Sequence, residues 1–218
     1  MPRTMIAVTL VLFLSFLPPA VGQTKSTAER LGYPRDSKLL IIHADDLAVA
    51  HSEDAASFDA LNQHAATSAS IMVPCPWLNE VADYAKAHPE ADLGLHLTLT
   101  SEWKTYRWGP VESKDKVSSL VDPSGYLWSE VAPAARNIRP EEAEREIRAQ
   151  VEHAVAVGIH PTHLDTHMGT LIATPELFAV FVKIAHGYNL PFLAPRQLTE
   201  RGRCIPHSQT KTFSWTRW

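Results

Sequence analysis

The segment KLLIIHADD, residues 38–46, runs through an apolar stretch into two adjacent aspartates. The apolar stretch predicts a buried strand over residues 38–43. Asp45 and Asp46 close the segment, and adjacent carboxylates repel each other unless a metal ion or a proton offsets one charge. The pair is therefore either one part of an active site or an ordinary turn that caps a helix.

Strands and helices alternate along the rest of the chain. Further strands are expected over residues 68–73, 93–100, 162–165 and 191–193, and helices over 52–64 (capped by Ser52), 77–88, 140–157 and 175–186. This alternation predicts an α/β fold with a mostly parallel sheet. Residues 101–138 form a long irregular insert after the third strand, and such loops usually build or cover an active site.

The first 22 residues have the pattern of a secretory signal peptide, with Arg3 followed by an uncharged apolar run over residues 5–17. The run is shorter than the roughly 20 residues that a membrane-spanning helix needs. We therefore expect a secreted or periplasmic protein that keeps no stable membrane anchor after cleavage. The expected organisation is a signal peptide over 1–22, a lead-in over 23–37, one domain over 38–200 and an irregular tail over 201–218.

The charge pattern bears on the possible partners. The formal net charge is −4, and the chain has no basic run. This composition argues against nucleic acid or an anionic membrane surface as the partner.

Polar residues alternate with leucines along the third expected strand, LGLHLTLT. Leucines 95, 97 and 99 share one face of the strand, and His96, Thr98 and Thr100 share the other. A face of this kind is unusual for a core and indicates a wet or metal-containing interior. His96 alone would also fit a hydrogen-bonded core histidine.

The segment HLDTH, residues 163–167, ends the fourth expected strand. His163, Asp165 and His167 occupy alternate positions and so share one face of an extended segment. They could form a structural polar network on their own. In a parallel barrel, however, the carboxyl ends of the strands meet at one mouth, where this segment can join His96 and the aspartate pair.

Such a cluster suits a particular chemistry. A carboxylate with two imidazoles is a typical ligand set for zinc or another divalent metal. The metal activates water and polarises a carbonyl, and a second carboxylate can act as general base. The residues therefore predict a metal-dependent hydrolase. They leave open which aspartate binds the metal, and which of His163 and His167 does.

Four stretches resemble a known family in order and spacing. They are HADDLAVAHSEDAA (43–56), TSASIMVPCPW (67–77), GLHLTLT (94–100) and PTHLDTHMG (161–169), and they resemble the motifs of the YdjC-type carbohydrate deacetylases, which include the chitooligosaccharide deacetylases. The resemblance implies a distorted (β/α) barrel with mostly parallel strands, incomplete if the chain is truncated. It also implies a hydrolase that removes N-acetyl groups from a carbohydrate substrate with a divalent metal ion, magnesium or zinc.

The resemblance also implies roles for individual residues. Asp46, His96 and His167 would be the metal ligands, and Asp45 would be the general base. His163 would be a second catalytic residue, and Asp165 would line the site or orient ligands. Three positions depart from the family pattern: His43 replaces Asn, Leu47-Ala48 replaces an aromatic-Gly pair, and Met168-Gly169-Thr170 stands where a further histidine is usual.

Aromatic residues are frequent in the insert. Trp103, Tyr106, Trp108, Tyr126 and Trp128 either stack on sugar rings or pack the insert down. Two other functions remain open beside deacetylation. One is a different metal-dependent amide or ester hydrolase on the same scaffold, and the other is an inactive sugar-binding remnant.

Overall fold

The computed structural model describes residues 24–195 and 213–216. The chain divides into two compact units, Met1–Leu40 and Ile41–Trp218. In the first unit, the short helix α2 (Thr27–Arg30) begins at a capping box formed by Ser26 and Glu29. The expected signal peptide lies outside the described residues, and within the described ones no helix has the length and apolarity to cross a membrane.

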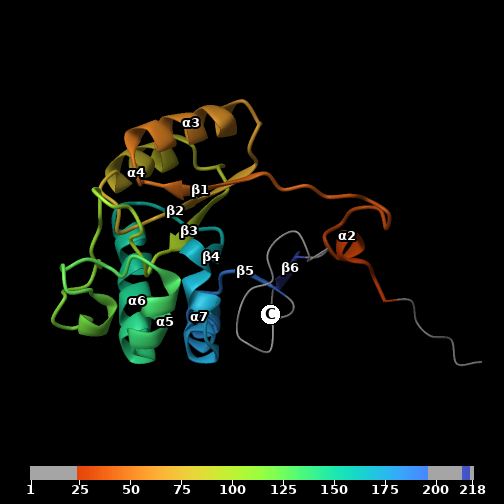
Figure 1. The fold of residues 1–218 in the computed structure, drawn as a ribbon. Coiled ribbons are helices and arrows are strands. Elements are labelled where there is room, and N and C mark those ends of the chain that lie inside the picture. The colour runs from red at the N-terminus through yellow and green to blue at the C-terminus, as the bar shows by residue number, and fades with distance from the viewer. Residues whose placement is uncertain (1–23, 196–212, 217–218) are drawn as a thin grey trace, which may run out of the picture. The chain divides into compact units, whose positions relative to one another are not determined.

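The second unit is built on one sheet of six strands in the order β1-β2-β3-β4-β5-β6 (Figure 1). Their bounds are β1 His43–Leu47, β2 Ser68–Ile71, β3 Leu93–Leu97, β4 Leu164–Thr166, β5 Phe192–Pro195 and β6 Phe213–Thr216. Strands β1 to β5 pair in parallel, and β6 pairs antiparallel with β5. The predicted α/β class with mostly parallel strands is confirmed. Among the described strands, β1 and β6 form the two edges of the sheet.

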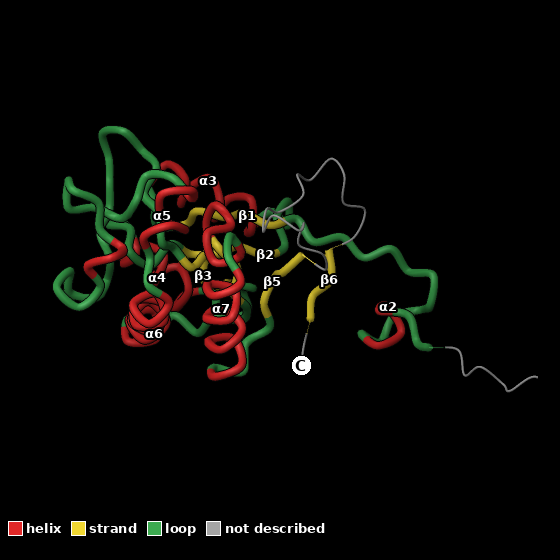
Figure 2. Tube along the Cα trace, turned by 60° about the horizontal axis from the view of Figure 1, so that its bottom comes forward, coloured by secondary structure: helices red, strands yellow, loops and turns green. Residues whose placement is uncertain are grey.

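Helices connect the parallel strands, as the alternating pattern predicts (Figure 2). They are α3 His51–Asn62, α4 Leu78–Ala87, α5 Val131–Asn137, α6 Pro140–Ala156 and α7 Pro175–Gly187. Two short 3-10 helices, η2 Ser118–Leu120 and η3 His167–Ile172, lie in the insert and directly after β4. Helices α6 and α7 both begin with proline at the first turn, which favours helix initiation.

The two faces of the sheet differ in chemistry. Ile71, Leu95 and Leu164 are fully buried on one face and belong to the same core cluster as Ile147 of α6 and Phe181 of α7. The opposite face carries buried polar side chains, among them Ser68, Ser70, His96 and Asp165. The alternation along the strands thus separates a hydrophobic core from a polar interior.

The insert is fastened to α6 by two buried glutamates. Glu146 accepts hydrogen bonds from the backbone N–H groups of Val111 and Glu112, both at 2.9 Å. Glu142 accepts one from the backbone N–H of Ser119 at 2.8 Å. The long segment after β3 is therefore held in place, although little of it is helical.

The first strand begins later than predicted. The expected strand over residues 38–43 is wrong, because β1 starts at His43 and the apolar residues before it are largely exposed, with Leu40 at 78%. Its partner β2 starts at Ser68, opposite His43, so pairing begins there. As a result, the HADD motif lies inside the strand instead of after it.

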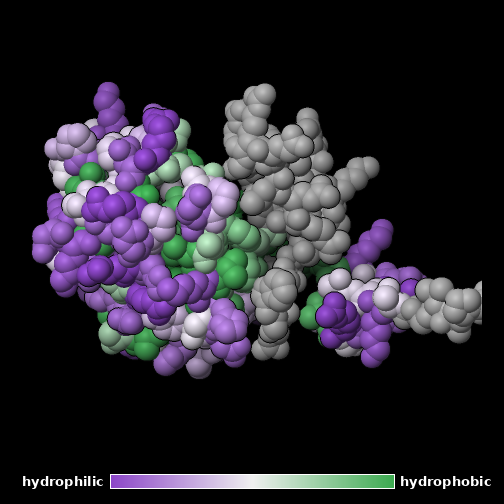
Figure 3. Space-filling model, turned by 90° about the horizontal axis from the view of Figure 1, so that it is seen from below, coloured by the Kyte–Doolittle hydropathy of each residue, from purple (hydrophilic) through white to green (hydrophobic). Residues whose placement is uncertain are grey.

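Two smaller expectations also differ from the structure. Ser52 does not cap its helix, because α3 begins one residue earlier and its N-cap is Ala50, which makes no side-chain cap. Strand β6 lies in the tail that was expected to be irregular. On the face shown in Figure 3, apolar residues form a band in the unit that carries the sheet, with polar residues to the left of it and below it.

Candidate metal centre

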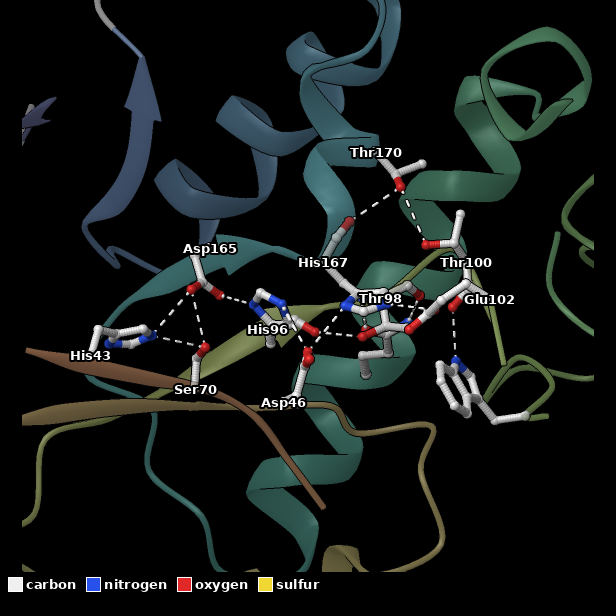
Figure 4. A network of polar contacts seen from close by, with 12 residues as sticks. His43, Asp46, Ser70, His96, Thr98, Thr100, Glu102, Asp165, His167 and Thr170 are labelled. Carbon is white, nitrogen blue, oxygen red and sulfur yellow. Dashed lines mark hydrogen bonds and ion pairs between the residues drawn. The ribbon is translucent and has the colours of Figure 1, made fainter. Parts of the chain in front are cut away.

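Three predicted ligands meet at the carboxyl ends of β1, β3 and β4 (Figure 4). The Asp46 Oδ1 atom lies 3.3 Å from His96 Nε2 and 3.2 Å from His167 Nδ1. One ligand atom from each residue lies within 4.8 Å of the others, a spacing that could hold a metal ion. Both imidazoles are buried, and Asp46 is partly exposed, so the group opens on one side.

The turn after the aspartates aims Asp46 at the imidazoles. Asp46 and Ala48 both have left-handed backbone conformations, with φ of 63° and 76°. Such a conformation is unfavourable for residues other than glycine and persists only where the surroundings enforce it. Backbone N–H groups of Met72 and Trp77 donate to the carbonyls of Leu47 and Ala48, at 2.8 and 3.1 Å. The site therefore rests on a strained turn that its neighbours hold.

A second carboxylate stands behind each imidazole. His96 Nδ1 lies 2.7 Å from Asp165 Oδ1, and His167 Nε2 lies 2.9 Å from Glu102 Oε2. Each ring is thus placed between two carboxylates, an arrangement that fixes the orientation of metal-binding histidines in proteins. Asp165 lies where the predicted orienting role requires.

The other oxygen of Asp165 is equally engaged. Its Oδ2 atom accepts a hydrogen bond from Ser70 Oγ at 3.0 Å and lies 3.3 Å from His43 Nε2. His43 also contacts the hydroxyl groups of Ser68 and Ser70, at 2.9 and 3.0 Å. The histidine that departs from the family pattern therefore supports the carboxylate behind His96.

The electrostatics of the group fit a cation. Burial acts to raise the pKa of Asp46, but hydrogen bonds with His167 and His96 outweigh it and hold that pKa well below its usual range. Burial acts to lower the pKa of His96, but Asp165 and Asp46 raise it above the ordinary value. Three carboxylates around two imidazoles favour positive charge at this point. A divalent ion would supply that charge in place of protons.

Asp45 lies beside this group without joining it. Its side chain is exposed, and among the described residues no hydrogen bond or ion pair links it to Asp46, His96 or His167. Its exposure leaves it accessible to water. Its role as general base stays a prediction.

His163 lies deeper along the polar face, away from the three ligands. Its Nδ1 atom is 2.8 Å from Thr162 Oγ1 and 3.5 Å from Asp92 Oδ1, and its ring packs edge-on against His43 with 5.3 Å between centroids. The ring covers Gly94, where any side chain would collide with it. Of the two histidines between which the pattern alone could not choose, the structure groups His167 with Asp46 and His96, and its role as a ligand stays a prediction. A catalytic role for His163 stays a prediction.

Two acidic residues of this region did not stand out in the sequence. Glu102 extends the alternation of His96, Thr98 and Thr100 by one more step, a signal that was available but lies inside the insert. Asp54, in the first turn of α3, is not one of the predicted metal ligands. Its side chain accepts a hydrogen bond from the Ala48 N–H. The one signal for Asp54 in the sequence was its position near the start of a predicted helix.

The aromatic residues of the insert divide into two kinds. Trp108 is buried and Trp128 partly buried, and their indole N–H groups donate to Thr100 and Ser119 carbonyls at 2.8 and 2.9 Å, so these two pack the insert down. Trp103 is 39% exposed, and its ring lies 6.2 Å from that of Trp108, which in turn lies 6.2 Å from His167. Trp103 is therefore the exposed end of an aromatic row beside the candidate metal centre.

Fold and site together define an α/β protein with a candidate divalent-metal centre at the carboxyl ends of its strands. The chain belongs to the YdjC-like protein family, whose model matches residues 39–217. The resemblance seen in the four motifs is confirmed.

Several curated proteins are similar to this chain. A carbohydrate deacetylase of Thermus thermophilus is 37% identical over 80% of this chain and 60% of its own length. A chitooligosaccharide deacetylase of Yersinia enterocolitica is 27% identical over 80% of this chain and 66% of its own length. The chain thus spans about three fifths of the length of the curated relatives it matches.

A solved structure has the same fold. It is an Enterococcus faecalis protein described as a candidate cellobiose-phosphate cleavage protein, with a TM-score of 0.66 and 28% sequence identity. The match covers 72% of this chain and 59% of that one.

Proposed function

We propose that the protein is a metal-dependent carbohydrate deacetylase, which hydrolyses the amide bond of N-acetylated sugars. The observation that carries the proposal is the group of Asp46, His96 and His167, with a carboxylate behind each imidazole. The similarity to carbohydrate and chitooligosaccharide deacetylases supports the choice of substrate. One carboxylate and two imidazoles favour zinc, with magnesium as the other candidate.

The reaction would divide between the two adjacent aspartates. A divalent ion held by Asp46, His96 and His167 would polarise the acetamide carbonyl and lower the pKa of a water molecule. Asp45 would accept a proton from that water as its oxygen attacks the acetyl carbon. The carbon–nitrogen bond then breaks, acetate leaves, and Asp45 returns the proton to the amine. Asp165 and Glu102 would keep His96 and His167 oriented throughout.

Export from the cytoplasm belongs to the same proposal. It is supported by the pattern of residues 1–22, a basic start followed by a short apolar run. N-terminal sequencing of the protein recovered from the producing cell, and from its surroundings, tests this. Cleavage near residue 22 is expected, and an intact N-terminus in the cytoplasm would contradict export.

The exposed end of the aromatic row would contact the sugar. An indole ring stacks on the apolar face of a pyranose, and the partly exposed Trp103 is the tryptophan of the row that is open to a ligand. Trp103→Ala should raise KM for chitooligosaccharides about fivefold, as loss of roughly 1 kcal/mol of stacking implies, with kcat within about twofold. Tyr126→Ala is the control, because Tyr126 is equally exposed but lies under Arg107. Equal KM values for the two variants would contradict a contact between Trp103 and the sugar.

Acetate release tests the activity itself. The purified protein is stripped with a chelator, reloaded with zinc or magnesium, and assayed on chitooligosaccharides. Acetate is expected only after reloading. Hydrolysis of acetate esters or phosphoesters without any acetate from N-acetylated sugars would indicate a different hydrolase. A folded, metal-loaded protein without any hydrolysis would indicate a sugar-binding remnant.

A further inference from the structure

A pair of acidic residues, Asp54 and Glu80, lies outside the metal centre, and Asp54 contacts the turn that follows Asp46. Asp54 in the first turn of α3 is 0% exposed, and its Oδ1 atom accepts a hydrogen bond from the Ala48 N–H at 2.7 Å. Its other oxygen, Oδ2, is buried and has no donor among the described residues. The same holds for Oε2 of Glu80, in the first turn of α4.

The two oxygens without a donor belong to neighbouring carboxyl groups, which interact with each other. Glu80 raises the pKa of Asp54 both through its charge and through its side chain, because two neighbouring carboxyl groups cannot both carry a charge at low cost. One proton held between them would satisfy both oxygens. Burial, with Glu80 nearby, raises the pKa of Asp54 to about 6 against the lowering effect of the Ala48 N–H. His51 is the basic neighbour, with Nδ1 at 2.8 Å from the remaining oxygen of Glu80.

The hydrogen bond to Ala48 falls on the strained turn. Ala48 has φ of 76° and stands two residues after the ligand Asp46, itself at 63°. Such a backbone conformation is unfavourable for a residue other than glycine and requires compensation from its surroundings. Asp54 supplies it on the N–H side of Ala48, while Trp77 binds the carbonyl side at 3.1 Å.

We propose that Asp54 is a positioning residue of the metal centre: its carboxyl group holds the Ala48 N–H and so keeps Asp46 aimed at His96 and His167. The inference rests on the metal centre of the proposed function. It assigns the α3–α4 acid pair to metal affinity, although neither carboxyl group touches a ligand.

Zinc titration of the chelator-stripped protein by calorimetry tests the role. Asp54→Ala should weaken zinc binding tenfold or more, the size expected for an outer partner of a metal site. Asp54→Asn should stay within about threefold of wild type, because its amide oxygen still accepts from Ala48 and its NH2 group donates to Glu80. Glu142→Ala is the matched control, since Glu142 is also a buried helix carboxylate that holds a loop N–H, but that loop carries no ligand.

A rescue variant separates positioning from general destabilisation. Glycine adopts φ of 76° without strain, so adding Ala48→Gly to Asp54→Ala should restore zinc affinity to within about threefold of wild type. If Asp54→Ala does not fold alone, the comparison is made in the Ala48→Gly background. There, a tenfold cost of Asp54→Ala would overturn the proposal, and near-equal binding would support it.

The outcomes distinguish the two proposals. A folded wild-type protein that binds neither zinc nor magnesium would overturn the metal centre itself. Wild-type binding, with Asp54→Ala binding as tightly as Glu142→Ala, would overturn only the role of Asp54. Thermal melting of each metal-free variant is the second readout, which establishes that the compared proteins are folded.

Discussion

Two buried aspartates lie close to the proposed centre and have opposite protonation chemistry. Asp165 is 7% exposed and is surrounded by donors: His96 at 2.7 Å, Ser70 at 3.0 Å and His43 at 3.3 Å. Asp54 is 0% exposed and has one backbone donor and a second carboxyl group beside it. Burial acts to raise both pKa values, but the imidazoles lower that of Asp165, whereas that of Asp54 rises to about 6.

The difference shows that the neighbours of a buried carboxyl group, more than its burial, decide its charge. Asp165 remains an anion, which suits a partner that must hold the Nδ1–H of a metal-binding imidazole. Asp54 keeps a proton below about pH 6, and its Oδ1 atom fixes the Ala48 backbone. Removing either residue should therefore have different consequences.

The largest effect is expected at Asp165. Asp165→Ala leaves His43, His96 and Ser70 without their shared acceptor, which should cost about 3–5 kcal/mol of unfolding free energy. Urea denaturation measures this loss, and zinc titration should show affinity about 10–100-fold weaker. Asp83→Ala is the control, since its exposed pair with Lys86 should be worth less by several-fold. Equal costs for both variants would contradict the account of Asp165.

The sequence predicts the polar interior well because strand alternation is a local property. His96, Asp165 and His167 follow from spacing alone, and the resemblance selects His167 over His163. The start of β1 was placed too early, because apolar composition cannot reveal that the partner strand begins only opposite His43.

The residues that support the ligands are harder to predict. Glu102 reaches His167 across 65 positions of sequence, and the Asp54–Glu80 pair joins two helices. These contacts depend on the path of the insert and on helix packing, which no local spacing records. The left-handed turn is equally hard to predict, because neither aspartate nor alanine indicates a positive φ in the way that glycine does.

A moderate effect is expected from the pH dependence of Asp54. Its pKa is raised from 3.8 to about 6 on folding, so the stability that its proton contributes is complete below pH 3.8 and lost as the pH rises through about 6. Two pKa units correspond to about 3 kcal/mol. Asp54→Asn cannot titrate, so its unfolding free energy relative to wild type should rise by up to that amount between pH 4 and pH 7. Parallel pH profiles for the two proteins would show that no shared proton exists.

The smallest effect is expected at Glu102. Glu102→Gln keeps an oxygen that can accept from His167 Nε2 but removes the charge, so zinc binding should weaken by about tenfold, or 1.4 kcal/mol. Glu112→Gln is the control, because Glu112 is an insert glutamate whose side chain, among the described residues, contacts Lys116 and the Ser113 N–H. An unchanged zinc affinity of Glu102→Gln would show that Glu102 does not orient His167, and would leave Asp165 as the orienting carboxylate.

The most direct test of the centre compares the two adjacent aspartates. Zinc stoichiometry and acetate release are measured side by side on wild type, Asp46→Asn and Asp45→Asn. Wild type should bind one ion per chain. Asp46→Asn should lose metal and activity together, whereas Asp45→Asn should keep its metal and lose at least about 100-fold in rate, as expected for a general base. Metal retained by Asp46→Asn, or full activity in Asp45→Asn, would contradict the assignment.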